Sequence, residues 1–176
     1  MKKTLLILML VPLVSFGQTK KELKVINKAA TDIKMKVDKF EGTTSWNSPY
    51  YGKGIAATTP KRVSFVKVKS KKGGFTNYLS LTTYGSTLNV GEKGLVILFQ
   101  DGTKIEKPNA DIDYESNTGS PYWEYTAFEG ISDEELEMFA TKKIDAFRLY
   151  MYEGRPITKK AVLQVMGYAR GMQKIN

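Results

Sequence analysis

Short stretches that alternate apolar and polar residues, separated by turn residues at intervals of about ten, constrain this fold most strongly. A period of two is that of a strand with one buried face. Residues 95–99 are apolar at every position, which predicts a central strand buried on both faces. The pattern predicts a mainly β fold, α+β at its margins: an antiparallel β-sandwich or open barrel. The predicted strands are residues 34–38, 63–70, 78–83, 95–99, 122–128 and 147–151.

Three segments carry helix signals. Ser132 and Glu135 have the spacing of a capping box and predict a short inserted helix that ends near Lys142. A final helix begins at Thr158, with one apolar face, and Thr19 to Glu22 predicts a helix near the N-terminus. We therefore expect a basic amphipathic segment over residues 18–33 and a single β-rich domain with a C-terminal helix over 34–176. The apolar face of the last helix is Val162, Val165, Met166, Ala169 and Met172.

The first seventeen residues have the pattern of a secretory signal peptide. Lys2 and Lys3 precede an apolar run over 5–14, and small residues at 15 and 17 suit a signal peptidase. The run is too short for a permanent membrane helix, and no later segment reaches that length, so we expect no transmembrane segment after cleavage. The sequence predicts cleavage before Gln18 and a bacterial protein that is exported, either periplasmic or secreted.

The chain contains no histidine and no cysteine, which excludes several kinds of chemistry. Ser–His and Cys–His nucleophiles, zinc sites of imidazole or thiolate, and disulfides are all impossible. No side chain titrates near neutral pH without a perturbed pKa, so we expect no enzyme and no cofactor.

The net charge of +9 falls to +7 without Lys2 and Lys3, a balance that favours solubility first and anionic partners second.

Alternating carboxylates at 111–115 form one candidate site. On a single strand Asp111, Asp113 and Glu115 would share a face, where they could hold Ca²⁺ or supply the paired carboxylates of a glycosidase. The favoured interpretation is a solvated strand face without metal. Calcium ranks ahead of catalysis as the alternative.

A basic strand forms the second candidate. Lys67, Lys69 and Lys71 alternate and could bind an anion, or they could protect an edge strand from aggregation, which is the favoured interpretation. Readers of single-stranded nucleic acid interleave stacking aromatic residues with their charges, and here only Phe65 lies on the lysine face. Nucleic acid is therefore not an expected ligand.

Aromatic residues in loops form the third candidate. Such residues stack on sugars or bind peptides when they stay exposed. The alternative is that the two tryptophans close the core at the ends of their strands. The candidate ligand-binding residues are Trp46, Tyr50, Tyr51, Tyr122 and Trp123.

The strand pattern also predicts the core. Its members are the apolar residues assigned to the inner face of each strand, together with the apolar face of the last helix. They are Val37, Val66, Val68, Leu79, Leu81, Ile97, Phe99, Phe147 and Leu149.

Residues 36–42, 44–46, 98–103 and 147–150 resemble the corresponding strands and turns of small secreted bacterial β-sandwich proteins of unknown function. The resemblance covers most of the chain after residue 17 and rests on packing and turn motifs. It implies a sandwich fold and brings no known activity, so it assigns no functional residues.

Three functional hypotheses follow. The first is a non-catalytic binding or interaction module of the cell envelope, with a glycan or an envelope protein as partner, because the usual catalytic side chains are missing. The second is a small carboxylate-dependent hydrolase of glycans or lipids. The third is a structural or assembly partner of an envelope complex, suggested by the basic N-terminal segment.

Overall fold

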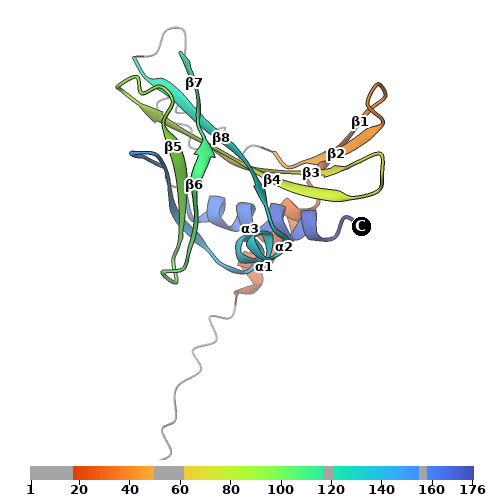
Figure 1. The fold of residues 1–176 in the computed structure, drawn as a ribbon. Coiled ribbons are helices and arrows are strands. Elements are labelled where there is room, and N and C mark those ends of the chain that lie inside the picture. Colours follow the sequence, from red (N-terminus) through yellow and green to blue (C-terminus); the bar gives the residue numbers. More distant parts are fainter. Residues whose placement is uncertain (1–17, 50–61, 117–120, 155–157) are drawn as a thin grey trace, which may run out of the picture.

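The computed structural model describes residues 18–49, 62–116, 121–154 and 158–176. The predicted signal peptide and the candidate residues Tyr50 and Tyr51 lie outside these ranges. The described chain forms two antiparallel sheets and three helices, without closing into a barrel (Figure 1). The predicted fold class is confirmed.

The larger sheet has six strands in the order β1-β2-β3-β4-β8-β7. Its first four strands follow one another along the chain as a meander, and β8 then pairs with β4. Residues 43–47 form a strand, where the sequence suggested a loop. The strands are β1 (Lys34–Asp38), β2 (Thr43–Asn47), β3 (Arg62–Lys69), β4 (Phe75–Gly85), β7 (Asp113–Ser116) and β8 (Trp123–Ile131).

The smaller sheet has four strands in the order β10-β9-β5-β6. β5 is central, as expected, but only one of its faces is buried: Leu95 and Ile97 are in the core, and Val96 is half-exposed. An Asp–Gly pair such as Asp101–Gly102 favours a type I′ turn, which needs a positive φ at both residues. Only Gly102 has a positive φ in the β5–β6 turn, so this turn is not of type I′. The strands are β5 (Lys93–Phe99), β6 (Lys104–Asp111), β9 (Ile144–Leu149) and β10 (Tyr152–Gly154).

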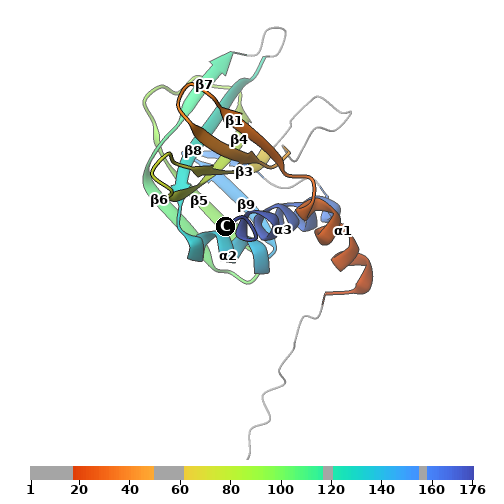
Figure 2. The ribbon, with the colours of Figure 1, turned by 90° about the vertical axis from the view of Figure 1, so that its right-hand side faces the viewer.

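The three helices begin at the residues that the capping signals predicted. Both capping boxes form, at Thr19 and at Ser132, and Thr158 caps the last helix. Figure 2 shows the last helix beneath the sheets with the first helix along it. Within the described ranges, no helix has the length and apolar character needed to cross a membrane. The helices are α1 (Lys20–Ala30), α2 (Asp133–Thr141) and α3 (Lys159–Gln173).

Two glycines of α3 allow α1 to pack closely against it. A Cβ atom on Gly167 would lie 2.4 Å from the backbone oxygen of Ile26, and one on Gly171 would lie 2.6 Å from that of Ala30. Both contacts are too short for any side chain, so only glycine fits. The 18–33 segment is therefore folded over most of its length and docked on the domain.

The core lies between the inner faces of the two sheets and includes α2 and α3. Of the predicted core residues, six in β4, β5 and β9 and all five on the helix face are buried. Three predictions are wrong: Val37 is 52% exposed, and Val66 and Val68 are half-buried on the opposite face of their strand. In β3 the inner face carries Val63 and Phe65 instead.

A tyrosine pair joins the two sheets. The rings of Tyr125 in β8 and Tyr152 in β10 stack with their centroids 4.3 Å apart. Their hydroxyls donate to the Thr87 carbonyl, at 2.5 Å and 2.6 Å, and Asn89 donates to both hydroxyls. The β4–β5 connection is thereby fixed to both sheets.

Candidate functional sites

Lys67 is a buried structural residue and does not belong to an anion site. Its Nζ donates to the carbonyl oxygens of Met172 (3.1 Å) and Ile175 (2.7 Å), and it lies 5.0 Å from the centre of the Phe75 ring. Its positive charge thus sits at the C-terminus of α3, where helix carbonyls favour a cation. β3 lies between β2 and β4, so the interpretation of its lysines as protection for an edge strand is also wrong.

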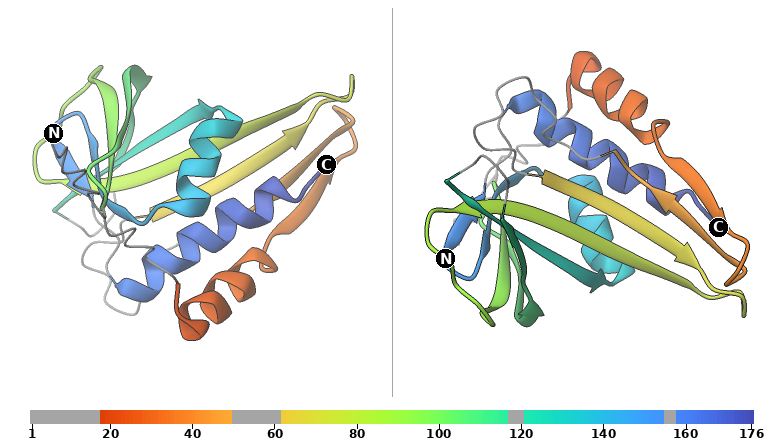
Figure 3. Two further views of the ribbon diagram at one scale, coloured as in Figure 1. Left: turned by 90° about the horizontal axis from the view of Figure 1, so that it is seen from below. Right: turned by 90° about the horizontal axis from the view of Figure 1, so that it is seen from above.

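Lys69 and Lys71 lie on a different surface, formed where two hairpins end side by side. A Cβ atom on Gly42, in the β1–β2 turn, would lie 3.7 Å from the Lys71 side chain of the β3–β4 turn. Figure 3 shows both turns at the same end of the large sheet. We call residues 34–42 and 69–75 the twin-hairpin tip.

The twin-hairpin tip has six exposed lysines and two acidic residues, Asp38 and Glu41, so its net charge is +4. None of the six forms an ion pair with a residue in the described part of the chain. Elsewhere in the described chain four lysines each contact a carboxylate at 2.8–3.0 Å, whereas the four lysines of α1, like those of the tip, form no such ion pair. The unpaired lysines of the tip are Lys34, Lys36, Lys39, Lys69, Lys71 and Lys72.

The twin-hairpin tip also exposes large apolar side chains. Phe40 is fully exposed (102%), Met35 is 63% exposed and Val37 is 52% exposed. The β1–β2 turn does not depend on the Phe40 ring, because Asp38 Oδ1 accepts the backbone N–H groups of Phe40 (2.8 Å) and Glu41 (3.1 Å). Those hydrogen bonds, with the Glu41 bond first, hold the pKa of Asp38 below its ordinary value.

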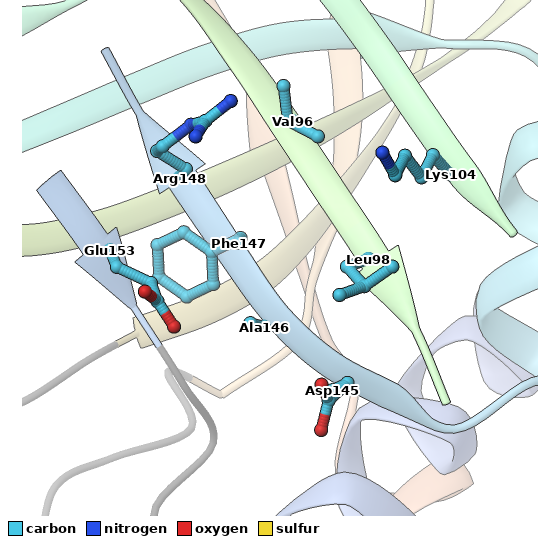
Figure 4. A pocket seen from close by; sticks show the side chains of 8 residues that line it. All are labelled: Val96, Leu98, Lys104, Asp145, Ala146, Phe147, Arg148 and Glu153. Atoms are coloured by element: carbon cyan, nitrogen blue, oxygen red, sulfur yellow. The ribbon is translucent and has the colours of Figure 1, made fainter. Parts of the chain in front are cut away.

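A second surface is the outer face of the small sheet. Two adjoining hollows there have volumes of about 310 Å³ and 250 Å³ and share Val96 and Arg148. Figure 4 shows the residues that line the first of them. Val96 and Leu98 are half-exposed on this face, and Ala146 lies beside Leu98 in the neighbouring strand. We call this surface the small-sheet groove.

The charges around the small-sheet groove are balanced. Three cations, Lys93, Lys104 and Arg148, and three anions line it, so its charge selects neither anions nor cations. Lys93 is engaged with Asp111 at 2.8 Å, and that contact raises the pKa of Lys93. The three anions are Glu106, Asp145 and Glu153.

The candidate calcium ligands do not share a strand. Asp111 ends β6 in the small sheet, where it pairs with Lys93, and Asp113 and Glu115 belong to β7 in the large sheet. The premise of one shared carboxylate face is therefore wrong. The described residues hold no group of three or more acidic side chains with metal-binding geometry.

The candidate aromatic residues do not form one site. Trp46 packs against the core and lies across the sheet from Lys67, Asn77 and Ile131. Ile131 is eight residues along β8 from Trp123, a separation of about 26 Å at strand spacing. Trp123 is half-buried against Tyr114, with ring centroids 6.2 Å apart, and Tyr122 beside it is 42% exposed.

The two most strongly shifted tyrosines lie outside both surfaces. Burial, followed by the hydrogen bond to Glu124 (2.5 Å), raises the pKa of Tyr84 to about 12. Burial, followed by the hydrogen bond with Tyr125, raises the pKa of Tyr152 to about 12. Both side chains stay protonated at neutral pH and donate hydrogen bonds, Tyr84 to Glu124 of β8 and Tyr152 to the Thr87 carbonyl of the β4–β5 connection.

No protein-family model, curated protein or solved structure matches this chain significantly.

Proposed function

We propose that this protein is an exported, non-catalytic binding module of the cell envelope, and that the twin-hairpin tip attaches it to an anionic partner surface. One observation carries the proposal: the twin-hairpin tip combines six exposed lysines, which have no ion-pair partners in the described chain, with the fully exposed Phe40. A cluster of one charge sign attracts ligands of the opposite sign and raises their association rate. The small-sheet groove has no comparable preference, because its charges cancel.

The other two hypotheses have less support. A hydrolase was suggested by the carboxylates at 111–115, which are divided between two sheets. An assembly role was suggested by the basic N-terminal segment, whose helix α1 packs on α3 through Ile26 and Ala29.

Retention on immobilised dextran sulfate tests the proposed function. We expect the protein to elute only at raised salt, and the double variant Lys71→Gln/Lys72→Gln to elute earlier, because tip charges dominate the contact. The matched control is Lys159→Gln/Lys160→Gln, which removes the same charge at the start of α3, about 20 Å from the end of that helix that contacts Lys67. Equal loss of retention in both variants would show that total charge, and not the tip, drives binding.

Export has its own test. N-terminal sequencing of protein from the periplasm or the medium should begin with Gln18 or its cyclised form. Soluble cytoplasmic protein that retains Lys2 and Lys3 would refute export.

A further inference from the structure

We infer that the anionic partner of the twin-hairpin tip is a lipid bilayer, with Phe40 entering the headgroup region; this inference rests on the proposed function. The first reason is the chemistry of the tip. Lipid interfaces bind surfaces that combine lysines with large apolar side chains, because the headgroups attract the charge and the acyl boundary accepts the ring. A soluble sulfated or phosphorylated polymer offers the charge alone.

The second reason is the exposure of Phe40. Its side chain is 102% exposed, so the folded protein provides no apolar contact that would explain a phenylalanine there. The turn is held by the backbone bond from Gly42 to Asp38 (2.9 Å) and by the Asp38 carboxylate. A polar residue at position 40 would leave these bonds intact, so the ring serves no purpose in the fold.

The third reason is the placement of charge around the ring. Lys39 precedes Phe40, and Lys71 of the neighbouring turn lies against Gly42, two residues after it. Figure 1 shows the β1–β2 hairpin curving away from the helices, so the tip projects from the body of the protein. A projecting ring with lysines beside it can reach a flat surface without hindrance from the rest of the fold.

Vesicle sedimentation tests the inference on protein that begins at Gln18, because an uncleaved apolar run over 5–14 would bind lipid by itself. The probes are vesicles of phosphatidylcholine and vesicles of phosphatidylcholine mixed with phosphatidylglycerol. We expect binding only to the anionic mixture, weakened about fivefold for each lysine that Lys71→Gln/Lys72→Gln removes. We expect Phe40→Ser to weaken it about tenfold, because the ring no longer leaves water.

The control for Phe40→Ser is Met151→Ser, which removes an apolar side chain that is 60% exposed in the β9–β10 turn. We expect it to bind as the wild type does. A Phe40→Trp variant should gain blue-shifted emission with anionic vesicles, above the signal of Trp46 and Trp123. Equal binding of Phe40→Ser and wild type, or unshifted emission from Phe40→Trp, would overturn the insertion of this ring.

The results also separate the two proposals. Tip-dependent retention on dextran sulfate without sedimentation on anionic vesicles would refute the lipid inference and leave the proposed function standing, with an acidic polymer or protein as partner. If the protein is neither retained on dextran sulfate nor sedimented with anionic vesicles, both the proposed function and the lipid inference are refuted.

Discussion

Two ends of the large sheet, the one at β4 and β8 and the one at the edge strand β1, show the same alternation of side chains between two faces. Only the first end is covered by another layer of the protein. Where β4 and β8 meet the small sheet, residues such as Leu81 and Ala127 are at most 1% exposed. In β1 the alternate residues Met35 and Val37 are 63% and 52% exposed. Alternation identifies the two faces of a strand, but burial depends on whether another layer lies opposite. The packed end gives the fold its stability, and the uncovered end is free to bind.

The largest expected contrast comes from the same substitution, phenylalanine to alanine, made once in the core and once at the twin-hairpin tip. Phe147→Ala in β9 should cost about 3–5 kcal/mol of unfolding free energy, because its ring is 1% exposed and fills the core. Phe40→Ala should change that free energy by less than about 0.5 kcal/mol, since its ring contacts only solvent. Denaturant unfolding of both variants measures the difference. A Phe40→Ala variant as damaged as Phe147→Ala would show that the tip is packed.

A smaller difference in unfolding free energy is expected between substitutions of two lysines of β3, the strand between the covered and the uncovered end of the large sheet. Lys67→Met should cost about 1.5–3 kcal/mol, because the carbonyls of Met172 and Ile175 lose a charged donor. Lys69→Met is the matched control, since Lys69 also lies 5.0 Å from the Phe75 ring but is exposed. Thermal unfolding should place the control within about 0.5 kcal/mol of the wild type. Similar losses in both variants would assign the stability to the Phe75 contact and not to the helix carbonyls.

The smallest effect is a dependence of stability on pH that arises in the β5–β6 turn of the small sheet. Asp101 accepts hydrogen bonds from the Thr103 hydroxyl and from Lys142, which lower its pKa from 3.8 to about 2. Because the folded pKa is the lower one, this contribution is complete above about pH 4 and is lost as the pH falls towards 2. Asp101→Asn should therefore flatten the acid limb of the stability profile between these values. An unchanged limb in the variant would show that Asp101 does not contribute to it.

The sequence predicted where helices begin better than it predicted which faces of the strands are buried. Capping residues and turn signals are local, so the helix starts at Thr19, Ser132 and Thr158 were predicted correctly. The faces of β3 were grouped correctly, with Phe65 and Lys67 together, but the wrong face was assigned to the core. A buried lysine gives no local signal of its partner, which here is a helix end 105 residues away in the sequence.

The candidate sites also depended on information that the sequence does not give: which strands share a sheet and which side chains are covered. The acidic residues at 111–115 run through consecutive strands of two different sheets, a division that sequence spacing does not reveal. The sequence does not mark Phe40 as exposed, since a large aromatic side chain in a turn usually packs against a neighbouring residue. The signal that could have revealed the tip was the density of lysines in both turns, together with their few acidic neighbours.

Hydrogen–deuterium exchange with and without anionic vesicles tests most directly whether the tip is the binding surface. If the tip binds the vesicles, exchange should slow over 34–42 and 69–75, with no change in the strands that line the small-sheet groove. Slower exchange confined to 93–98 and 145–153 would contradict it and assign binding to the groove instead.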